Sequence, residues 1–418
     1  MVKVLHFADA HIDIATHGRH DIESGLPVRV LDFLKALDTI VDTAILEKVD
    51  LVVFAGDAYK DRSPSPTFQR EWGRRIIRLS NAGVHTLLLV GNHDISPASG
   101  RAHTLQEFDT LEVPNVRVIY KPVFLRPEDL WGLPIQVLAI PWVFRSGLMA
   151  SMELSIADHS KLNEEIEIRL TEILETWMNQ LDPALPTLLT AHGSVQGAVY
   201  GNERTVMLGK DLVLPGSLIK DHRLDYVALG HIHKFQNLNP ENHPPVIYSG
   251  SIERVDFGEA GDEKFFVIAE VNKGATTFQE RKLNGREFFD LKIKITAKEN
   301  MMEKILSSFP DVKRLRDSVV RITIEYPHDL DVFIDENTIR EQCRSALEFH
   351  LIRRPQEEAR LRISPDQDIA SLTPAELLGI YWKDSRTDSQ QDLEPLQEMA
   401  RSIIQSVTEG SQQPKEVD

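Results

Sequence analysis

Seven side chains of types that bind metal ions occur in five short motifs within the first 233 residues of the chain. Two of the motifs are an Asp-x-His pair and a His-x-His pair. Alternate residues of an extended segment face the same side, so both members of each pair can reach one site. The candidate ligands are Asp9, His11, Asp57, Asn92, His192, His231 and His233.

The ligand types indicate divalent cations. Carboxylate, amide oxygen and imidazole together suit manganese, with magnesium, iron or zinc as alternatives. The set contains no thiolate, which disfavours a structural zinc site. Seven ligands are too many for one ion that must keep room for a substrate. They suit two ions about 3.5–4 Å apart that share a bridging carboxylate.

The elements that must position these residues alternate between short apolar runs and helical periodicity. Strands are expected at Val2–Ala8, Leu51–Ala55 and Val84–Val90, with helices between them across residues 31–45 and Phe68–Leu79. This order predicts a largely parallel sheet flanked by helices. Because ligands bind beyond the carboxyl ends of such strands, the polar residues after each strand are expected to converge.

Further elements follow up to a turn at Asn284-Gly285, which we take as a domain boundary. A helix is expected from about Ala157 to Gln180, and further strands end near His192 and His231. The last strands of this part are expected at Val246–Tyr248, Lys264–Ala269 and Thr276–Arg281.

The spacing of apolar residues changes after residue 285, and the sequence predicts three domains in all. Residues 1–285 form the first, residues 286–363 form a small α+β domain, and residues 364–418 hold a linker, C-terminal helices and a disordered tail. In the small domain, alternation predicts strands across 291–295 and 320–324, and helical spacing predicts helices across 302–309 and 339–347. The C-terminal helices are expected at Pro374–Trp382 and Leu393–Val407.

Composition limits the classes of protein. The formal net charge of −17 argues against a protein that coats nucleic acid by neutralising phosphates. It does not exclude an enzyme that holds a phosphodiester through cations. No apolar run reaches the roughly 18–20 residues of a membrane span. The single cysteine, Cys343, and the absence of a signal-peptide pattern predict a cytoplasmic protein.

The five motifs, in this order, resemble those of the calcineurin-type metallophosphoesterase superfamily. That resemblance implies a metallophosphoesterase β-sandwich flanked by helices. The run Tyr248–Glu259 also resembles the SbcD family, the DNA double-strand-break nuclease subunit, as do the stretches Leu5–His11 and Leu372–Leu378.

The resemblance to SbcD implies a metal-dependent DNA exonuclease or endonuclease with two divalent ions. Asp9, His11 and His233 would hold the first ion, and Asp57 would bridge both. His93 would assist the departing 3′-oxygen and would be oriented by Asp94. The second ion would be held by Asn92, His192 and His231.

The resemblance also implies partners. The C-terminal helices would bind the coiled-coil base of an SbcC-type ATPase, and the protein would be a homodimer within a heterotetramer. The same resemblance implies that residues 286–363 form a capping domain and that DNA is the substrate.

Two other functions remain open from the sequence. A small-molecule phosphodiesterase or phosphatase needs only the first 285 residues, and a scaffold subunit would require a missing ligand. Two features depart from the family pattern: Lys60 stands where an Asp or His is more usual, and the segment Asp13–Leu26, with His17 and His20, is unusually polar. Exonuclease and endonuclease activity are not distinguished.

Overall fold

The computed structural model of the 418-residue chain describes residues 1–14, 19–95, 102–142, 159–201 and 213–356, together with residues 373, 375, 376, 378 and 398–404. The chain divides into two compact units. The first comprises Met1–Leu291, Pro310–Arg321 and Gln342–His350, and the second comprises Lys292–Phe309, Ile322–Glu341 and Leu351–Asp418.

The first unit contains a six-stranded sheet whose centre is parallel. Its strands β1 (Val2–Phe7), β2 (Leu51–Phe54), β3 (His85–Leu89) and β4 (Val116–Ile119) are parallel neighbours. Beside β1, β13 (Lys264–Val271) runs antiparallel, and β14 (Thr277–Leu283) forms the far edge. The apolar runs at β2 and β3 are buried almost throughout, as strands covered on both faces require.

A second six-stranded sheet in the same unit has the order β11-β12-β10-β7-β6-β5. The strands β6, β7, β10 and β12 are parallel, and the edge strands β5 and β11 are antiparallel to their neighbours. Their bounds are β5 (Val123–Leu125), β6 (Gln136–Ile140), β7 (Thr187–His192), β10 (Tyr226–Gly230), β11 (Gln236–Asn237) and β12 (Val246–Tyr248).

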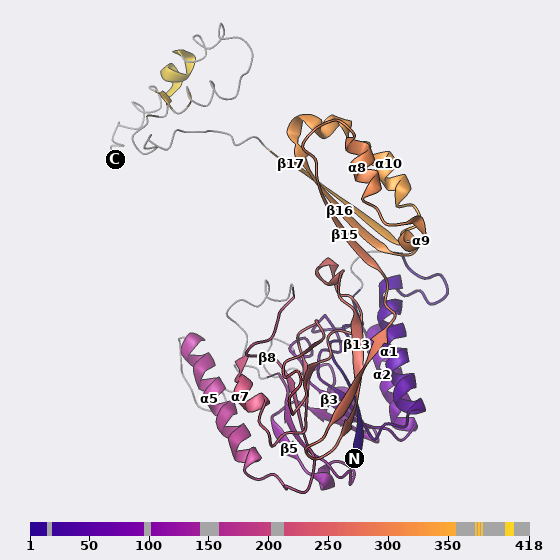
Figure 1. Ribbon diagram of the computed structural model, residues 1–418, viewed down its shortest axis with the longest axis vertical. Coiled ribbons are helices and arrows are strands. Elements are labelled where there is room, and N and C mark those ends of the chain that lie inside the picture. The colour runs from indigo at the N-terminus through magenta and orange to yellow at the C-terminus, as the bar shows by residue number, and fades with distance from the viewer. Residues whose placement is uncertain are drawn as a thin grey trace, which may run out of the picture. The chain divides into compact units, whose positions relative to one another are not determined.

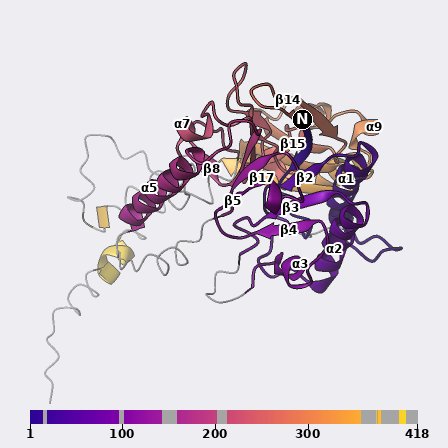
Figure 2. The same ribbon diagram turned by 90° about the horizontal axis from the view of Figure 1, so that it is seen from below.

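The two sheets share one apolar core, and helices cover their outer faces. Val4 and Val53 of the first sheet pack in the same buried cluster as Val137 and Ala228 of the second. On the outer face of the first sheet lie α1 (Val28–Leu46), α2 (Pro66–Asn81) and α3 (Gln106–Thr110). On the outer face of the second lie α5 (His159–Met178) and α7 (Gly216–Ile219), so the helices flank the strands from opposite sides (Figures 1 and 2).

This architecture confirms the predicted α/β fold, a β-sandwich flanked by helices. The apolar stripe of α1 explains why it forms, because Phe33, Leu37 and Val41 all face the core at helical spacing. The predicted strand Val246–Tyr248 has the bounds of β12, and the other expected strands of this part differ from the observed ones by two residues or fewer at each end. Small additional elements are β8 (Ser194–Val195), β9 (Val213–Leu214), η1 (Pro127–Asp129) and η2 (Phe257–Glu259).

The small α+β part contains a three-stranded sheet of order β15-β16-β17. Its strands are β15 (Phe288–Lys294), β16 (Val319–Pro327) and β17 (Glu348–Gln356), and its helices are α8 (Met301–Ser307), α9 (Val312–Leu315), η3 (His328–Phe333) and α10 (Glu336–Gln342). The predictions of a strand at 320–324 and of a helix at 302–309 are confirmed by β16 and α8.

One predicted helix in this part was too long. The helix expected across residues 339–347 ends at Gln342, so Cys343 is buried but lies in a turn rather than on the helix. The backbone N–H of Leu347 donates to Ser318 O at 2.8 Å, so the chain has already turned toward β16, and β17 follows from Glu348. The strand β17 was not predicted.

Much of the predicted C-terminal region lies outside the described residues. Within it, residues 398–404 are helical, inside the predicted helix Leu393–Val407. Thr373 and Glu376 exchange capping hydrogen bonds, with Thr373 N donating to Glu376 Oε2 at 2.8 Å. In the part of the chain that the structure describes, no helix is both long and apolar enough to cross a bilayer.

Candidate metal centre

The candidate ligands lie where the parallel strands of both sheets end. Asp9 follows β1, Asp57 follows β2 and Asn92 follows β3, while His192 ends β7 and His231 follows β10. Their convergence at the carboxyl ends is the arrangement expected for an α/β site. Two groups have ligand atoms within 4.8 Å of one another: Asp9, His11 and His233 in one, and Asp9, Asp57 and His192 in the other.

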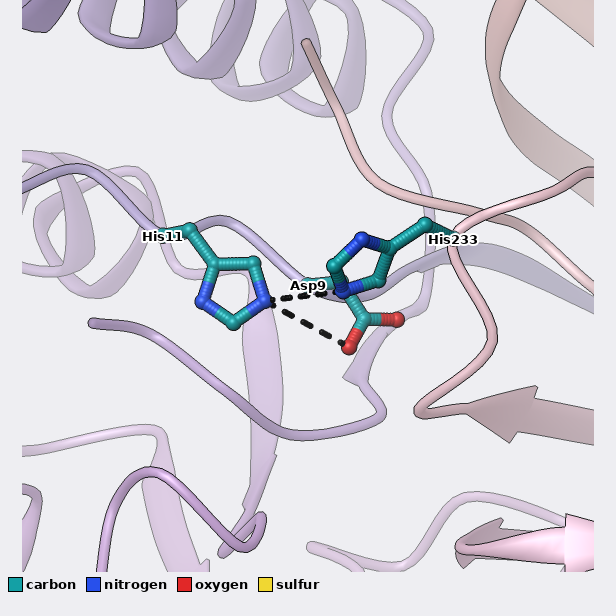
Figure 3. Close-up of side chains that lie close together, drawn as sticks. All are labelled: Asp9, His11 and His233. Carbon is teal, nitrogen blue, oxygen red and sulfur yellow. Dashed lines mark hydrogen bonds and ion pairs between the residues drawn. The ribbon is translucent and has the colours of Figure 1, made fainter. Parts of the chain in front are cut away.

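The imidazoles of His11 and His233 face each other through their Nε2 atoms, 3.1 Å apart (Figure 3). The Nδ1 atom of His11 lies 3.1 Å from Tyr59 O, and that of His233 lies 2.7 Å from Glu259 Oε1. A carbonyl or carboxylate oxygen only accepts, so each Nδ1 carries the hydrogen of a neutral ring. Two Nε2 lone pairs therefore point at each other beside the Asp9 carboxylate, which is the geometry of ligands around a cation.

A second convergence surrounds the side-chain oxygen of Asn92. His192 Nε2 and His231 Nδ1 each lie 3.0 Å from Asn92 Oδ1. The Nδ1 of His192 lies 2.6 Å from Ala55 O, which fixes the hydrogen on that nitrogen when the ring is neutral. The neutral His192 ring and the amide oxygen then both present lone pairs to the same space.

The carboxylate of Asp57 lies between these two groups. Its Oδ2 atom is 3.9 Å from His11 Nε2 and 3.5 Å from His192 Nε2. Its Oδ1 atom accepts the backbone N–H of His93 at 2.8 Å. One oxygen is thus held by the chain, and the other is directed to both groups.

The electrostatics of the buried site favour a positive charge. Asp9 and Asp57 are both buried, and burial raises the pKa of Asp9. Burial alone lowers the pKa of His192, but Asp57 and Asp9 outweigh it and raise that pKa to about 9. The buried carboxylates therefore favour positive charge on their neighbours, and the surrounding set of oxygen and nitrogen donors fits divalent metal ions.

The backbone around the ligands is held in uncommon conformations. Asp9, His11, Asp57 and His231 have φ values of 50°, 41°, 65° and 98°, which non-glycine residues seldom adopt. Such strain persists only where surrounding contacts impose it, and it is concentrated at functional sites.

Glycine at two positions allows the chain to approach the ligands closely. A Cβ atom added to Gly56 would overlap the His192 ring, and one added to Gly91 would overlap the Asp57 carboxylate. The small residues beside the motifs therefore serve close packing around the candidate ligands.

His93 lies at the edge of the group, with its ring centroid 5.3 Å from that of His11. Its Nδ1 atom lies 2.8 Å from Lys60 O, so Nδ1 donates to that carbonyl and Nε2 is the atom that can exchange a proton with a substrate. The expectation that Asp94 orients His93 does not match these hydrogen bonds. The buried Asp94 carboxylate instead accepts from the backbone N–H groups of Asp57, Ala58 and Gly91 and from Thr104 Oγ1.

Asp94 therefore organises the loops rather than the His93 ring. It ties the loop after β2 to the loop after β3, because its two oxygens reach both segments. Burial and the nearby Asp57 charge raise its pKa to about 7.

The sequence did not identify three residues that hold parts of the candidate site. Glu259 binds His233 as described above, and Lys264 binds Glu259 at 2.6 Å. Asp13, in the polar segment noted earlier, accepts from the backbone N–H groups of Lys60 and Asp61. Glu259 lies in the Tyr248–Glu259 run noted above, whereas no motif includes Lys264, and no spacing rule links these residues to the ligands.

Other residues of interest have structural partners. Arg75 and Arg78 pair with Asp38 at 2.7 and 2.8 Å, and Arg74 pairs with Glu71 at 3.1 Å. These three arginines of α2 are therefore paired with acidic residues of α1 and α2. His17 lies outside the described residues.

Comparison with known proteins identifies the family to which the first part of the chain is similar. Residues 2–235 match the calcineurin-like phosphoesterase family, and this stretch includes all seven candidate ligands. The chain is 24% identical over 298 residues to the uncharacterized metallophosphoesterase YhaO of Bacillus subtilis (strain 168), which covers 71% of this chain and 64% of that protein.

Two named nucleic-acid proteins are similar at the same level. The SbcD subunit of the nuclease SbcCD of Escherichia coli (strain K12) is 25% identical over 352 residues, covering 79% of this chain and 80% of that protein. The DNA double-strand break repair protein Mre11 of Archaeoglobus fulgidus is 25% identical over 320 residues, covering 73% and 64%. The chain thus spans just under two thirds of YhaO and of this Mre11. With more than half of its length matched and the candidate metal ligands gathered at the strand ends, the chain belongs to the calcineurin-like phosphoesterase family.

Proposed function

We propose that this protein is a two-metal nuclease that hydrolyses phosphodiester bonds of DNA. The observation that carries the proposal is the convergence of ligand atoms on both sides of Asp57 Oδ2, with His93 beside them. Asp9, His11 and His233 would hold one ion, Asn92, His192 and His231 the other, and Asp57 both. Manganese suits these donors, with magnesium, iron or zinc as alternatives.

When bound, two divalent ions supply the charge that screens the anionic phosphodiester, and they favour deprotonation of water near neutral pH. The chain supplies the rest. Asp57 keeps one oxygen directed to both groups because its other oxygen is held by His93 N. His93 donates Nδ1–H to Lys60 O, and burial lowers the pKa of its ring, so the protonated ring readily passes its Nε2 proton to the departing oxygen.

DNA is proposed as the substrate for two reasons. Two similar proteins are named as a nuclease subunit and a DNA repair protein, and the similarity to each extends beyond the family match into the second part of the chain. The net charge of −17 fits an enzyme whose cations, rather than clustered lysines, neutralise the phosphates. The second candidate, a small-molecule phosphodiesterase, is favoured by the family match, which needs only residues 2–235 and implies a phosphoesterase without naming a substrate.

One assay separates these two functions. The purified chain with manganese is offered end-labelled linear duplex DNA, single-stranded DNA and a chromogenic small phosphodiester, with an EDTA-treated sample and the variant His93→Asn as controls. We expect manganese-dependent cleavage of DNA that both controls lose. Rapid turnover of the small ester with intact DNA would instead establish the second candidate.

The proposal extends to domains, assembly and location. It divides the chain at residues 285 and 363, places the protein in the cytoplasm and assigns the C-terminal helices to an SbcC-type coiled-coil ATPase. Similarity to a protein named as part of the nuclease SbcCD supports the proposed ATPase partner.

Two experiments test the assembly. Light scattering of the purified chain is expected to give the mass of a homodimer. Co-purification with the ATPase is expected to fail once residues 364–418 are deleted. A monomer, or undiminished co-purification, would contradict these assignments.

A further inference from the structure

The carboxylate of Glu259 is buried and surrounded by hydrogen-bond donors. The residue is 5% exposed and ends the short helix η2. His233 Nδ1 lies 2.7 Å from Oε1, while Lys264 Nζ, Val255 N and Ser251 Oγ lie 2.6, 3.0 and 3.2 Å from Oε2. Four donors around one carboxylate favour its ionised form.

The ammonium group of Lys264 completes this arrangement. Lys264 begins β13 and is only 2% exposed. Besides Glu259, its Nζ atom donates to Ser251 Oγ at 2.7 Å and to His233 O at 3.2 Å. The three donor hydrogens thus have three acceptors, as a buried charge requires. The result is that one ion pair holds both the ring and the main chain of His233.

The main chain of His233 has a further contact on the same side. The backbone N–H of Ser251 donates to His233 O at 3.0 Å. A Cβ atom on Gly250, whose φ is 76°, would lie 2.6 Å from His233 O. The segment Ser249–Ser251 therefore packs directly against the loop that carries His233.

This support differs from that of two other candidate ligands. The Nδ1 atoms of His11 and His192 face the neutral backbone carbonyls of Tyr59 and Ala55. His233 instead faces a charged carboxylate. A carboxylate that accepts Nδ1–H fixes the tautomer with a bare Nε2 and makes that nitrogen a stronger ligand.

We infer that Glu259 and Lys264 are a positioning pair that sets the cation affinity of the group formed by Asp9, His11 and His233. The inference rests on the proposed two-metal function, since it concerns the strength of one of the two positions. Neither residue touches the substrate in this account, and both act through His233.

The test compares two buried glutamates. Glu259→Gln keeps the size and an acceptor but removes the charge. Glu253→Gln is the matched control, because Glu253 is 1% exposed and its oxygens accept from the backbone N–H groups of Arg254 and Arg286 rather than from a candidate ligand. Manganese is titrated into the full chain in the absence of DNA, and bound ions are counted by calorimetry and by electron paramagnetic resonance.

We expect Glu259→Gln to weaken one of the two binding steps by about 10–100-fold, because loss of such a partner has that effect on metal affinity. The other step and both steps of Glu253→Gln are expected to match the wild type. Equal affinities in Glu259→Gln and wild type, or equal weakening of both steps, would overturn the inference. Neither outcome depends on DNA cleavage. If DNA is not the substrate, the cleavage assay shows this independently of the manganese titration.

A second measurement needs no variant. In the ¹H–¹⁵N spectrum of the metal-free wild type, His233 is expected to carry its hydrogen on Nδ1, with a strongly downfield proton bonded to Glu259. A His233 ring with its hydrogen on Nε2 would overturn the inference even if Glu259→Gln fails to fold.

Discussion

The Nε2 atoms of His11 and His233 lie 3.1 Å apart, although the two residues are separated by 222 positions in the chain. Each ring directs its Nδ1 to an oxygen acceptor, Tyr59 O for His11 and Glu259 Oε1 for His233. Two facing lone pairs repel unless a positive charge lies between them. The fold therefore brings together groups that a positive charge stabilises, and this is the physical basis of the proposed function.

Removal of metal ions is expected to destabilise the first unit. Without cations, the buried carboxylates of Asp9 and Asp57 and the facing imidazoles lose their compensating charge. An ion at 100 times its dissociation constant stabilises the folded state by about 2.7 kcal/mol. Manganese added to EDTA-treated protein should therefore raise the Tm by about 4 °C for each ion that binds a unit of this size. A Tm that does not respond to manganese would contradict the metal site.

His93→Asn is expected to separate binding from catalysis. The ring contributes no ligand in this account, so two manganese ions should still bind. Loss of a positioned acid typically costs 10²–10⁴-fold in rate, and we expect a fall in kcat of about that size. Metal content by mass spectrometry and single-turnover cleavage are the two measurements. Loss of metal in this variant would show that His93 is a ligand instead.

Two glycine-to-alanine substitutions should have opposite effects. Gly91→Ala places a methyl group onto the Asp57 carboxylate, so we expect weaker manganese binding and a lower Tm. Gly73→Ala, within α2, meets no heavy atom within 4 Å and should stabilise the protein by about 0.5–1 kcal/mol through helix propensity. Calorimetry of both variants gives binding and stability together. Wild-type metal affinity in Gly91→Ala would mean that Asp57 is not a ligand.

Asp13 is expected to matter more than the side chain of Lys60. The Lys60 carbonyl holds His93, and Asp13 holds the peptide N–H groups of Lys60 and Asp61. Asp13→Ala should lower kcat by up to about 100-fold, because small misplacements of a catalytic group can cost that much. Lys60→Ala retains the carbonyl and should change kcat by less than about threefold. The opposite ranking in a cleavage assay would assign the role to the lysine charge.

The sequence was informative wherever the chemistry lies in residue types and strand ends. The apolar runs before Asp9, Asp57 and Asn92 predicted β1, β2 and β3, and hence which polar residues converge. The sequence did not predict contacts between residues that are distant in the chain and belong to no common motif. Lys60 O holds His93 through a backbone atom that every residue possesses, so no side-chain motif could have identified it.

Similar reasons explain the other differences. Asp94 follows His93 in the sequence, which suggested a direct contact. Its carboxylate instead accepts two backbone N–H groups from the loop after β2, together with Gly91 N and Thr104 Oγ1. The apolar spacing of Cys343 and Ala346 favoured a longer helix than α10. The hydrogen bond from Leu347 to Ser318 prevails, since sheet pairing satisfies the backbone beyond Gln342.

The most direct test of the account is anomalous diffraction from crystals soaked in manganese. We predict two peaks about 3.5–4 Å apart, with Asp57 between them, His11 and His233 at one, and Asn92 and His192 at the other. Crystals that show no peak at these residues, or a single peak that Asp57 does not contact, would contradict the two-metal centre.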